Sequence, residues 1–198
     1  MGKRYHHGEV RGEAIAAALA ITEADGPDAV TMRAVANRVG VDHRAIYRHF
    51  TDRDRLLAEV AAEGFGDLLS ALLSAEGEAG LQRDFTASIR FALARPHLHA
   101  LMLSRPRELM FDGAALEAAV RAMLDHLMAS ARLALGETAE SATCRDLVFS
   151  ALGTSYGLVS LASSMTLAPR DPQEMEAFLT DQVSAVIEGQ LLRLRASA

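Results

Sequence analysis

The sequence predicts an all-α fold, and three observations support that fold class. Half of the 198 residues are hydrophobic, yet only 5% are aromatic and there is no tryptophan. Ala, Leu, Met, Glu and Arg dominate the composition, and these residue types favour helices. The chain has no sustained alternation of apolar and polar residues, and no hairpin pair such as Asn-Gly between β-branched runs.

The first two helices are predicted by caps and by apolar spacing. A helix is expected over residues 10–25, and Gly26-Pro27 should end it. Thr31 is a suitable N-cap for a second, short helix, and Gly40 suits the left-handed position just beyond its end. Between them, four apolar residues at i, i+3, i+4 and i+7 would bury one side: Met32, Val35, Ala36 and Val39.

A third helix should start after Asp42, which can cap it. Ile46 and Phe50, four residues apart, would point into the core. The opposite side would then carry His43, Arg44, Tyr47 and Arg48. Two short helices joined at a glycine are typical of a helix-turn-helix, whose second helix enters the major groove of DNA. The alternative is that this charged face is simply solvated, as on many helical proteins.

The rest of the chain divides into longer helices. Thr51-Asp52-Arg53-Asp54 reads as a capping box that opens a long linking helix, and residues 74–80 form a loop rich in breakers. Asp171-Pro172-Gln173-Glu174 predicts the start of the last helix. We therefore expect a helix-turn-helix domain over 1–55, a helical effector-binding and dimerisation domain over 56–198, and helical segments at about 81–94, 96–104, 113–135, 138–168 and 172–195.

Charge and cysteine content restrict the function classes. The net charge is −6, but residues 1–55 carry nine Lys or Arg against eight Asp or Glu, so the acidic excess lies elsewhere. Attraction to phosphates would therefore come from a local patch. The single cysteine, Cys144, excludes an internal disulfide and fits a reducing cytoplasm. The start of the chain lacks the apolar run of a signal peptide, and seven Ser or Thr interrupt the uncharged stretch 147–169, which we interpret as a buried helix rather than a membrane span.

Residues 10–60 resemble the DNA-binding domain of the tetracycline-repressor (TetR) family of transcriptional regulators. The resemblance rests on Ala17-Ala18-Leu19, Gly26, the run 31–36, Gly40-Val41, the run Ile46–Phe50 and the run 52–57. The leading Arg4-Tyr5-His6-His7-Gly8 is similar to a start found in one subgroup of that family. About a third of the chain is covered. The remainder is similar only in length and helical organisation, as the family's diversity of effectors implies.

Candidate DNA contacts follow from the third helix and from the resemblance. His43, Arg44 and Arg48 are expected to contact base edges, and Ala45 a thymine methyl group. Lys3 and Arg4 could form an arm in the minor groove, or be a disordered terminus. The resemblance implies that Arg33 contacts a base or phosphate. It also implies phosphate contacts, which fix register without reading sequence, for Thr31, Tyr47, His49 and Arg53.

The predicted C-terminal domain suggests self-association and an effector pocket. Residues 175–194 place apolar side chains at near-heptad spacing, and Gly153, Gly157, Ser160 and Ser164 would let another helix approach closely. A two-fold dimer through the last two helices is favoured, as the resemblance also implies, and ordinary monomer core is the alternative. Adaptable and aromatic side chains could line a pocket for a small, largely apolar molecule. These are Phe91, Met102, Met110, Phe111, Met123, His126, Phe149 and Tyr156.

The rival classes have little support in the sequence. His97-Leu98-His99 would point its two imidazoles apart on a helix, and we expect no metal and no cofactor. No metalloprotease motif, phosphate-binding loop or nucleophile elbow occurs, so an enzyme is disfavoured. By the resemblance, we expect a dimeric repressor that binds an inverted-repeat operator and is released by a small effector. The alternative is a DNA-binding regulator that needs no ligand.

Overall fold

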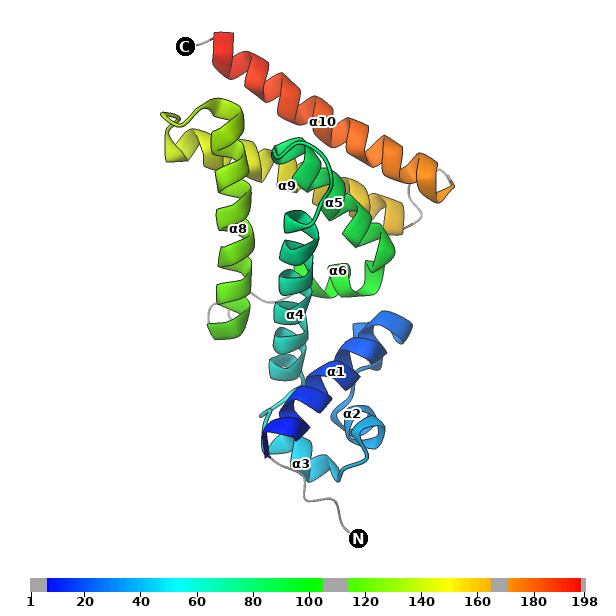
Figure 1. The fold of residues 1–198 in the computed structure, drawn as a ribbon. Coiled ribbons are helices and arrows are strands. Elements are labelled where there is room, and N and C mark those ends of the chain that lie inside the picture. Colours follow the sequence, from blue (N-terminus) through cyan, green and yellow to red (C-terminus); the bar gives the residue numbers. More distant parts are fainter. Residues whose placement is uncertain (1–6, 105–113, 165–170, 197–198) are drawn as a thin grey trace. The chain divides into compact units, whose positions relative to one another are not determined.

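The computed structural model describes residues 7–104, 114–164 and 171–196, and these residues contain helices, turns and loops but no strand. The predicted all-α fold class is therefore confirmed (Figure 1). The helices are α1 (His7–Asp25), the short 3₁₀ helix η1 (Pro27–Ala29), α2 (Met32–Val39), α3 (His43–Tyr47), α4 (Arg53–Leu73), α5 (Leu81–Ala94), α6 (Pro96–Leu103), α8 (Ala114–Leu135), α9 (Ser141–Ser163) and α10 (Pro172–Ala196).

The chain divides into two compact units, which we describe separately. The first unit extends from the N-terminus to Gly66 and takes in Arg95–Val120, and the second consists of Asp67–Ala94 and Arg121–Ala198. This division falls within α4 and within α8, so each of these helices belongs partly to both units. The functional boundary expected between residues 55 and 56 stays a prediction.

In the first unit, α1, η1, α2 and α3 form what we call the head. Helix α1 packs against both α2 and α3, and α2 packs against α3. Small side chains allow this close packing, because Ala14 and Ala18 on α1 are completely buried. Val35 and Ile46 are also completely buried and join α2 and α3 to that core. The apolar spacing read from the sequence therefore identifies the core of the head.

The turn between α2 and α3 depends on Gly40. Its φ of 80° and ψ of 32° lie in the left-handed region, which a glycine adopts without the steric cost of a Cβ. The N–H groups of Gly40 and Val41 both donate to the carbonyl oxygen of Ala36, at 2.9 and 3.0 Å. These bonds satisfy a carbonyl at the end of α2 and turn the chain toward α3.

Helix α6 lies against α1 and makes a close approach to α4 in the same unit. A Cβ built on Gly64 of α4 would lie 2.8 Å from Sδ of Met102 and 3.1 Å from Cδ1 of Leu98. At its other end, α6 is tied to α1, because Nε of Arg95 donates to Oε1 of Glu23 at 2.6 Å. The ring Nδ1 of His97 also lies 3.1 Å from the carbonyl oxygen of Glu23.

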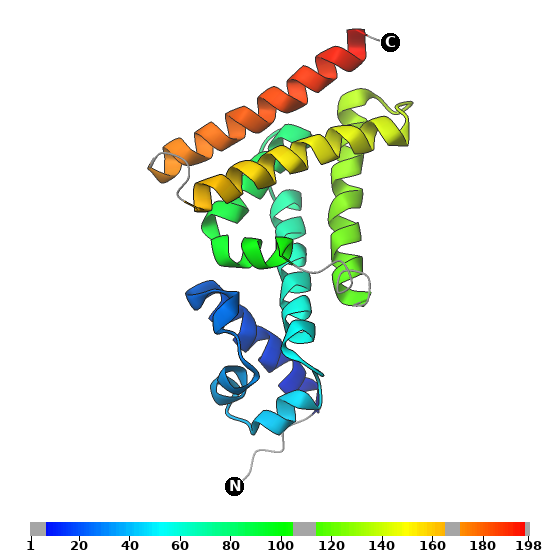
Figure 2. The ribbon, with the colours of Figure 1, turned by 180° about the vertical axis from the view of Figure 1, so that it is seen from behind.

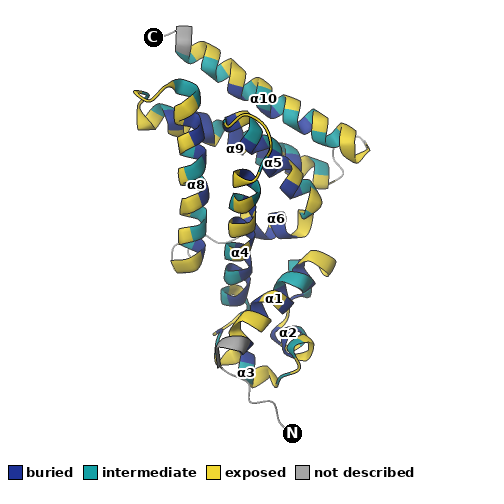
Figure 3. Ribbon diagram, viewed as in Figure 1, coloured by how far each residue is buried: buried dark blue, intermediate teal, exposed yellow. Residues whose placement is uncertain are grey.

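The second unit is built around α5, α9 and α10. Helices α9 and α10 run antiparallel side by side, and α10 also packs against α5 (Figures 1 and 2). Leu147 and Ala151 of α9 are completely buried, as is Leu179 of α10. Buried and exposed residues alternate along α8 and α10, as expected of amphipathic helices (Figure 3). None of the described helices is both long and apolar enough to cross a lipid bilayer.

Most predicted helix limits agree with the structure, and three differ. The helix expected over about 138–168 is α9, which begins at Ser141 and ends at Ser163. The start of α10 is as expected: Oδ1 of Asp171 accepts from the N–H groups of Gln173 and Glu174, both at 2.9 Å. The capping box expected to begin at Thr51 is wrong, because Asp52 caps α4 by accepting from the Arg55 N–H at 2.8 Å. Helix α1 begins at His7 rather than Val10.

Candidate nucleic-acid interface

The outer face of α3 is the most conspicuous polar surface of the head. The side chains of His43, Arg44, Tyr47 and Arg48 are exposed, whereas Ile46 is buried completely and Phe50 is only 3% exposed. Ile46 and Phe50 thus fix the rotation of α3 about its axis, and that rotation turns the guanidinium groups outward. The predicted inward and outward sides of α3 are both as expected.

Local contacts hold α3 in this orientation. Oδ1 of Asp42 accepts from the Arg44 N–H at 2.8 Å and so caps the helix. The rings of His43 and Tyr47 meet edge to face, with centroids 6.3 Å apart and planes at 86°. Such pairs are favourable for aromatic rings. The exposed fraction of Tyr47 is still 51%, so its hydroxyl remains accessible to a partner.

Thr31 occupies the N-cap of α2. Its Oγ1 accepts from the Ala34 N–H at 3.0 Å, and the Thr31 residue is exposed. A hydroxyl can donate one hydrogen bond while it accepts others, so this cap leaves the O–H able to donate to a phosphate oxygen. The N-terminus of α2 also offers the positive end of the helix dipole. The phosphate contact of Thr31 stays a prediction.

The remaining predicted DNA contacts fall into two groups. Arg33 is exposed on the first turn of α2, and Ala45 and His49 are half-buried beside the exposed face of α3. Lys3 and Arg4 lie outside the described residues, so the predicted arm cannot be placed. Apart from Arg53, the other predicted DNA contacts all lie on α2, on α3 or within two residues of them. They are Thr31, Arg33, His43, Arg44, Ala45, Tyr47, Arg48 and His49.

Arg53 differs from the other predicted phosphate contacts, because its guanidinium is engaged within the head. Nε donates to the carbonyl oxygen of Val30 at 2.7 Å, and Nη2 donates to that of Pro27 at 2.6 Å. Asp28 and Asp54 lie within 3.5 and 3.9 Å of the same guanidinium. Arg53 therefore ties the start of α4 to the segment that precedes α2. Its phosphate role stays a prediction.

The predicted effector pocket is only partly brought together. Phe91, Met123, His126 and Tyr156 belong to the second unit, and burial raises the pKa of Tyr156 to about 12. Met102 belongs to the first unit and packs against Gly64. Phe149 is 54% exposed on α9, and Met110 and Phe111 lie outside the described residues.

Sequence reasoning missed a buried polar cluster next to His126. Asp84 of α5 is completely buried, and its Oδ2 accepts a short hydrogen bond from Ser130 of α8 and lies 3.0 Å from Nε2 of His126. Its Oδ1 accepts from the Arg83 guanidinium at 2.7 Å. The sequence does carry a signal, because Asp84 interrupts the apolar side of α5 between Leu81 and Phe85.

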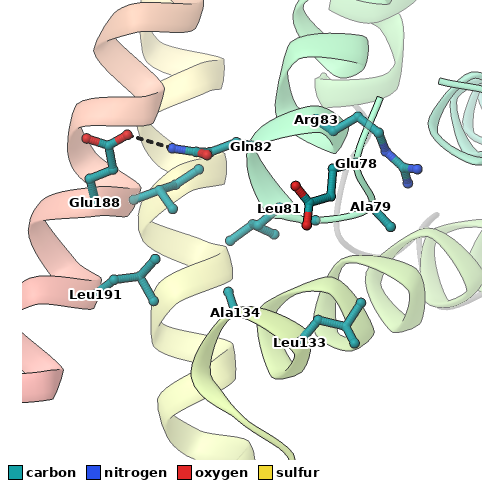
Figure 4. Close-up of a pocket in the computed structure, with 11 residues that line it drawn as sticks. Glu78, Ala79, Leu81, Gln82, Arg83, Leu133, Ala134, Glu188 and Leu191 are labelled. Carbon is teal, nitrogen blue, oxygen red and sulfur yellow. Dashed lines mark hydrogen bonds between the residues drawn. The ribbon is translucent and has the colours of Figure 1, made fainter. Parts of the chain in front are cut away.

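A surface cleft of about 490 Å³ lies in the second unit between α5, α8 and α10. Figure 4 shows Leu81, Leu133 and Leu191 around it, with Gln82 donating to Oε1 of Glu188 at 2.8 Å. None of the predicted pocket residues that the structure describes lines this cleft. It is therefore distinct from the effector pocket expected from the sequence.

The face of α9 turned away from its core carries small and apolar residues. Phe149, Gly153 and Gly157 follow one another at four-residue spacing, and all three are exposed. A Cβ built on either glycine meets no described atom within 4 Å. On α10, Leu192 is 67% exposed. Gly153 and Gly157 belong to the small residues at which the sequence predicts the approach of a second copy, whereas Phe149 was predicted to line the effector pocket.

Comparisons with known proteins agree with this arrangement. Residues 14–60 match the family model described as "Bacterial regulatory proteins, tetR family", a segment that contains the helix-turn-helix. No curated protein matches the chain.

Solved structures match over nearly the full length. A protein of unknown function from Rhodococcus sp. RHA1 is 28% identical, with 95% of this chain and 98% of that chain covered and a TM-score of 0.72. A TetR transcriptional regulator from Rhodococcus sp. RHA1 is 16% identical, with 92% and 98% covered and a TM-score of 0.67. A TetR variant from Acinetobacter baumannii AYE, in complex with minocycline, is 22% identical, with 93% and 97% covered and a TM-score of 0.67.

The fold class and the helix-turn-helix thus agree with the resemblance drawn from the sequence. The subgroup expected from the Tyr5-His6-His7-Gly8 start stays a prediction. Residues 14–60 thus match the model of a family of bacterial regulators, and solved TetR structures share the fold over most of the chain.

Proposed function

We propose that the chain is a dimeric transcriptional repressor that binds an inverted-repeat DNA operator and is released by a small, largely apolar effector. The observation that carries this proposal is the outer face of α3. Arg44 and Arg48 are exposed there on a helix whose rotation is fixed by buried Ile46 and Phe50. A guanidinium that reaches the major groove can bind guanine O6 and N7 with two hydrogen bonds.

The dimer follows from how little DNA one such helix can contact. Helix α3 has five residues, so two copies at neighbouring turns of the duplex are needed for useful specificity. The exposed residues Phe149, Gly153 and Gly157 on α9 suit a two-fold contact, because glycines let helices approach closely and Phe149 supplies apolar area. An isologous interface of this kind would bring together two copies of the same surface.

The effector proposal rests on chemistry in the second unit. Phe91 and Met123 are largely buried there, and the polar cluster of Asp84, Ser130 and His126 adds hydrogen-bonding groups to an otherwise apolar interior. Binding sites for small molecules commonly combine apolar walls with a few such polar groups. The similar protein from Acinetobacter baumannii AYE was solved in complex with minocycline, which supports a small-molecule site in this fold.

Selection of bound DNA from a random pool tests the core of the proposal. The expected result is an inverted repeat whose half-sites are separated by about one helical turn or a multiple of it. A variant with both Arg44 and Arg48 replaced by alanine should select nothing above background. Recovery of a single asymmetric site, or equal enrichment by this double variant, would contradict the proposal.

Sedimentation tests the dimer with a matched pair of substitutions. Gly157→Glu places a charge on the exposed side of α9 and should yield monomers that fail to bind the paired half-sites. Ala129→Glu places the same charge on an exposed position of α8 and should leave the dimer intact. A screen of apolar compounds for DNA release then separates an effector-released repressor from a ligand-independent regulator.

A further inference from the structure

A small cleft lies beside the end of α3, and His49 alone of the described residues predicted to contact DNA lines it. Its volume is about 270 Å³, and it lies entirely within the first unit. It is bounded by α1, by the segment that follows α3 and by the first turns of α4. The polar and aromatic residues that line it are Arg11, His49, Phe50, Thr51, Arg55 and Glu59.

Arg11 is held in this cleft by two contacts. Its Nη2 lies 2.7 Å from Oε1 of Glu59, and its guanidinium carbon lies 5.6 Å from the centre of the Phe50 ring. Phe50 is 3% exposed and belongs to the core, so it is a fixed surface for the guanidinium to cover. The Arg11 side chain is nevertheless 46% exposed. A guanidinium has five N–H donors, so a bond to one carboxylate oxygen leaves donors for a second anion.

The charges around the cleft favour an anion. The guanidinium groups of Arg11 and Arg55 line it, against the one carboxylate of Glu59 among its lining residues. This balance is opposite to the net charge of −6 of the whole chain. His49 follows the exposed Arg48 directly, so the cleft is close in sequence to the face proposed to contact bases.

The engagement of Arg53 strengthens the case for this cleft. Nε and Nη2 of Arg53 already donate to carbonyl oxygens within the head, at 2.7 and 2.6 Å, so these two groups are less available to a phosphate. Arg11, by contrast, pairs with the single carboxylate of Glu59; the two side chains are 46% and 26% exposed, so solvent screens the pair and limits its contribution to stability. A phosphate could therefore displace Glu59 from Arg11 at small cost.

We propose that Arg11 and Arg55 hold one backbone phosphate of the DNA in this cleft, and that Glu59 positions Arg11 in the free protein and competes with that phosphate. The inference rests on the proposed DNA-binding function and deepens it. Arg11 and Arg55 are then positioning residues, because a phosphate contact fixes the register of α3 on the duplex without reading its sequence.

Opposite effects of two substitutions test the proposal. On the operator, Arg11→Ala should weaken binding about tenfold, and it should do so equally on random DNA. The slope of log Kobs against log salt should fall by about 0.9 for each copy of the chain bound. Glu59→Gln should instead strengthen binding about threefold, because it removes a competing carboxylate. Arg132→Ala, which removes an exposed arginine from α8 in the other unit, is the matched control and should change neither quantity.

The opposite changes in DNA affinity expected for Arg11→Ala and Glu59→Gln distinguish a phosphate site from a merely structural ion pair. If the Arg11–Glu59 pair only stabilised the head, both substitutions would weaken DNA binding together, and the proposal would be overturned. Unchanged affinity and salt slope for Arg11→Ala would also overturn it, while DNA binding by the wild-type chain would leave the proposed function standing. Absence of DNA binding by the wild-type chain would remove the proposed function itself.

A second arm distinguishes DNA phosphate from free phosphate. Inorganic phosphate at millimolar concentration is titrated against the wild-type chain and Arg11→Ala, with thermal unfolding as the readout. Protection that depends on Arg11, combined with loss of DNA affinity in the same variant, supports the cleft as a phosphate site used by DNA. Protection that depends on Arg11 without any change in DNA affinity would assign the cleft to a free anion and overturn the proposal.

Discussion

The Nε of Arg53 donates to the carbonyl oxygen of Val30 across a distance of 2.7 Å. This bond joins the start of α4 to the residue just before the N-cap of α2. It satisfies a backbone acceptor at a point where the chain has left one helix and has not yet entered the next. The helix-turn-helix is therefore bound to the linking helix by a side chain for which the resemblance implied a phosphate contact.

Replacement of Arg53 should destabilise the head. Arg53→Ala removes two hydrogen bonds made by a charged, partly buried group, and we expect a loss of about 2 kcal/mol in the free energy of unfolding. Arg53→Lys keeps the charge but loses the planar fork, so it should recover little of that stability. Urea unfolding of both variants checks this. Full stability of the lysine variant would contradict a structural role for the planar guanidinium.

Arg44 and Thr31 should differ in how they affect sequence preference. Arg44→Ala is expected to cost roughly 1–3 kcal/mol on the operator and to relax preference at one base pair, because a base contact is lost. Thr31→Ala should weaken operator and random DNA alike, because a phosphate contact carries no sequence information. Fluorescence anisotropy on the two DNAs measures both. Equal losses for Arg44→Ala on operator and random DNA would contradict its assignment to a base.

His99 should make the folded state sensitive to acid. The residue is 5% exposed, and burial lowers its pKa from 6.5 to about 4. Between pH 6.5 and about pH 4, His99 is therefore protonated in the unfolded chain but neutral in the folded chain. Stability is unaffected above pH 6.5 and falls across this window, by as much as about 3 kcal/mol.

A comparison with His99→Gln isolates this effect from other titrating groups. Urea unfolding at pH 7.5 and at pH 4.5 should give a smaller drop in stability for the variant than for the wild-type chain. The difference between the two drops is the contribution of the imidazole. Identical pH dependence in both proteins would show that His99 is accommodated in its charged form.

Asp84 should be among the costliest single positions in the second unit. Asp84→Ala would leave the guanidinium of Arg83 and the hydroxyl of Ser130 without their carboxylate, and we expect a loss of about 3 kcal/mol. Asp146→Ala is the control, because that carboxylate is 79% exposed and lies 4.0 Å from its arginine. The control should change stability by less than about 0.5 kcal/mol. Comparable losses at the two sites would contradict a special role for the buried cluster.

Much of the fold could be predicted because its signals are local. Asp171 and Glu174 lie within one turn of each other, and the left-handed turn at Gly40 follows from a single residue type. The face of α3 follows from the four-residue spacing of Ile46 and Phe50. Each of these features depends on residues close together in the chain, and helix periodicity relates such residues directly.

The parts that sequence reasoning missed depend on contacts between distant segments. Arg11 and Glu59 are 48 positions apart, and Asp84 and Ser130 are 46 positions apart, so no spacing rule relates them. The resemblance implied a phosphate contact for Arg53, but two carbonyl oxygens that no side-chain pattern reveals already accept from it. Thr51 was expected to cap α4, and the neighbouring Asp52 does so instead. The Thr51 hydroxyl and the Asp52 carboxylate are both suitable caps by residue type, and the residue at which the backbone becomes helical determines which of them caps α4.

Because Gly64 has no side chain, α6 can lie close to α4, and a larger residue at this position would alter their spacing. A single methyl group there would meet the thioether of Met102, which can swing aside, and then Leu98, which has less room. Further enlargement would have to displace α6, whose first residues are bonded to the end of α1 through Glu23. Alanine, serine and valine at position 64 would thus displace α6, and with it the end of α1, by increasing amounts. None of these substitutions alters a residue proposed to contact DNA.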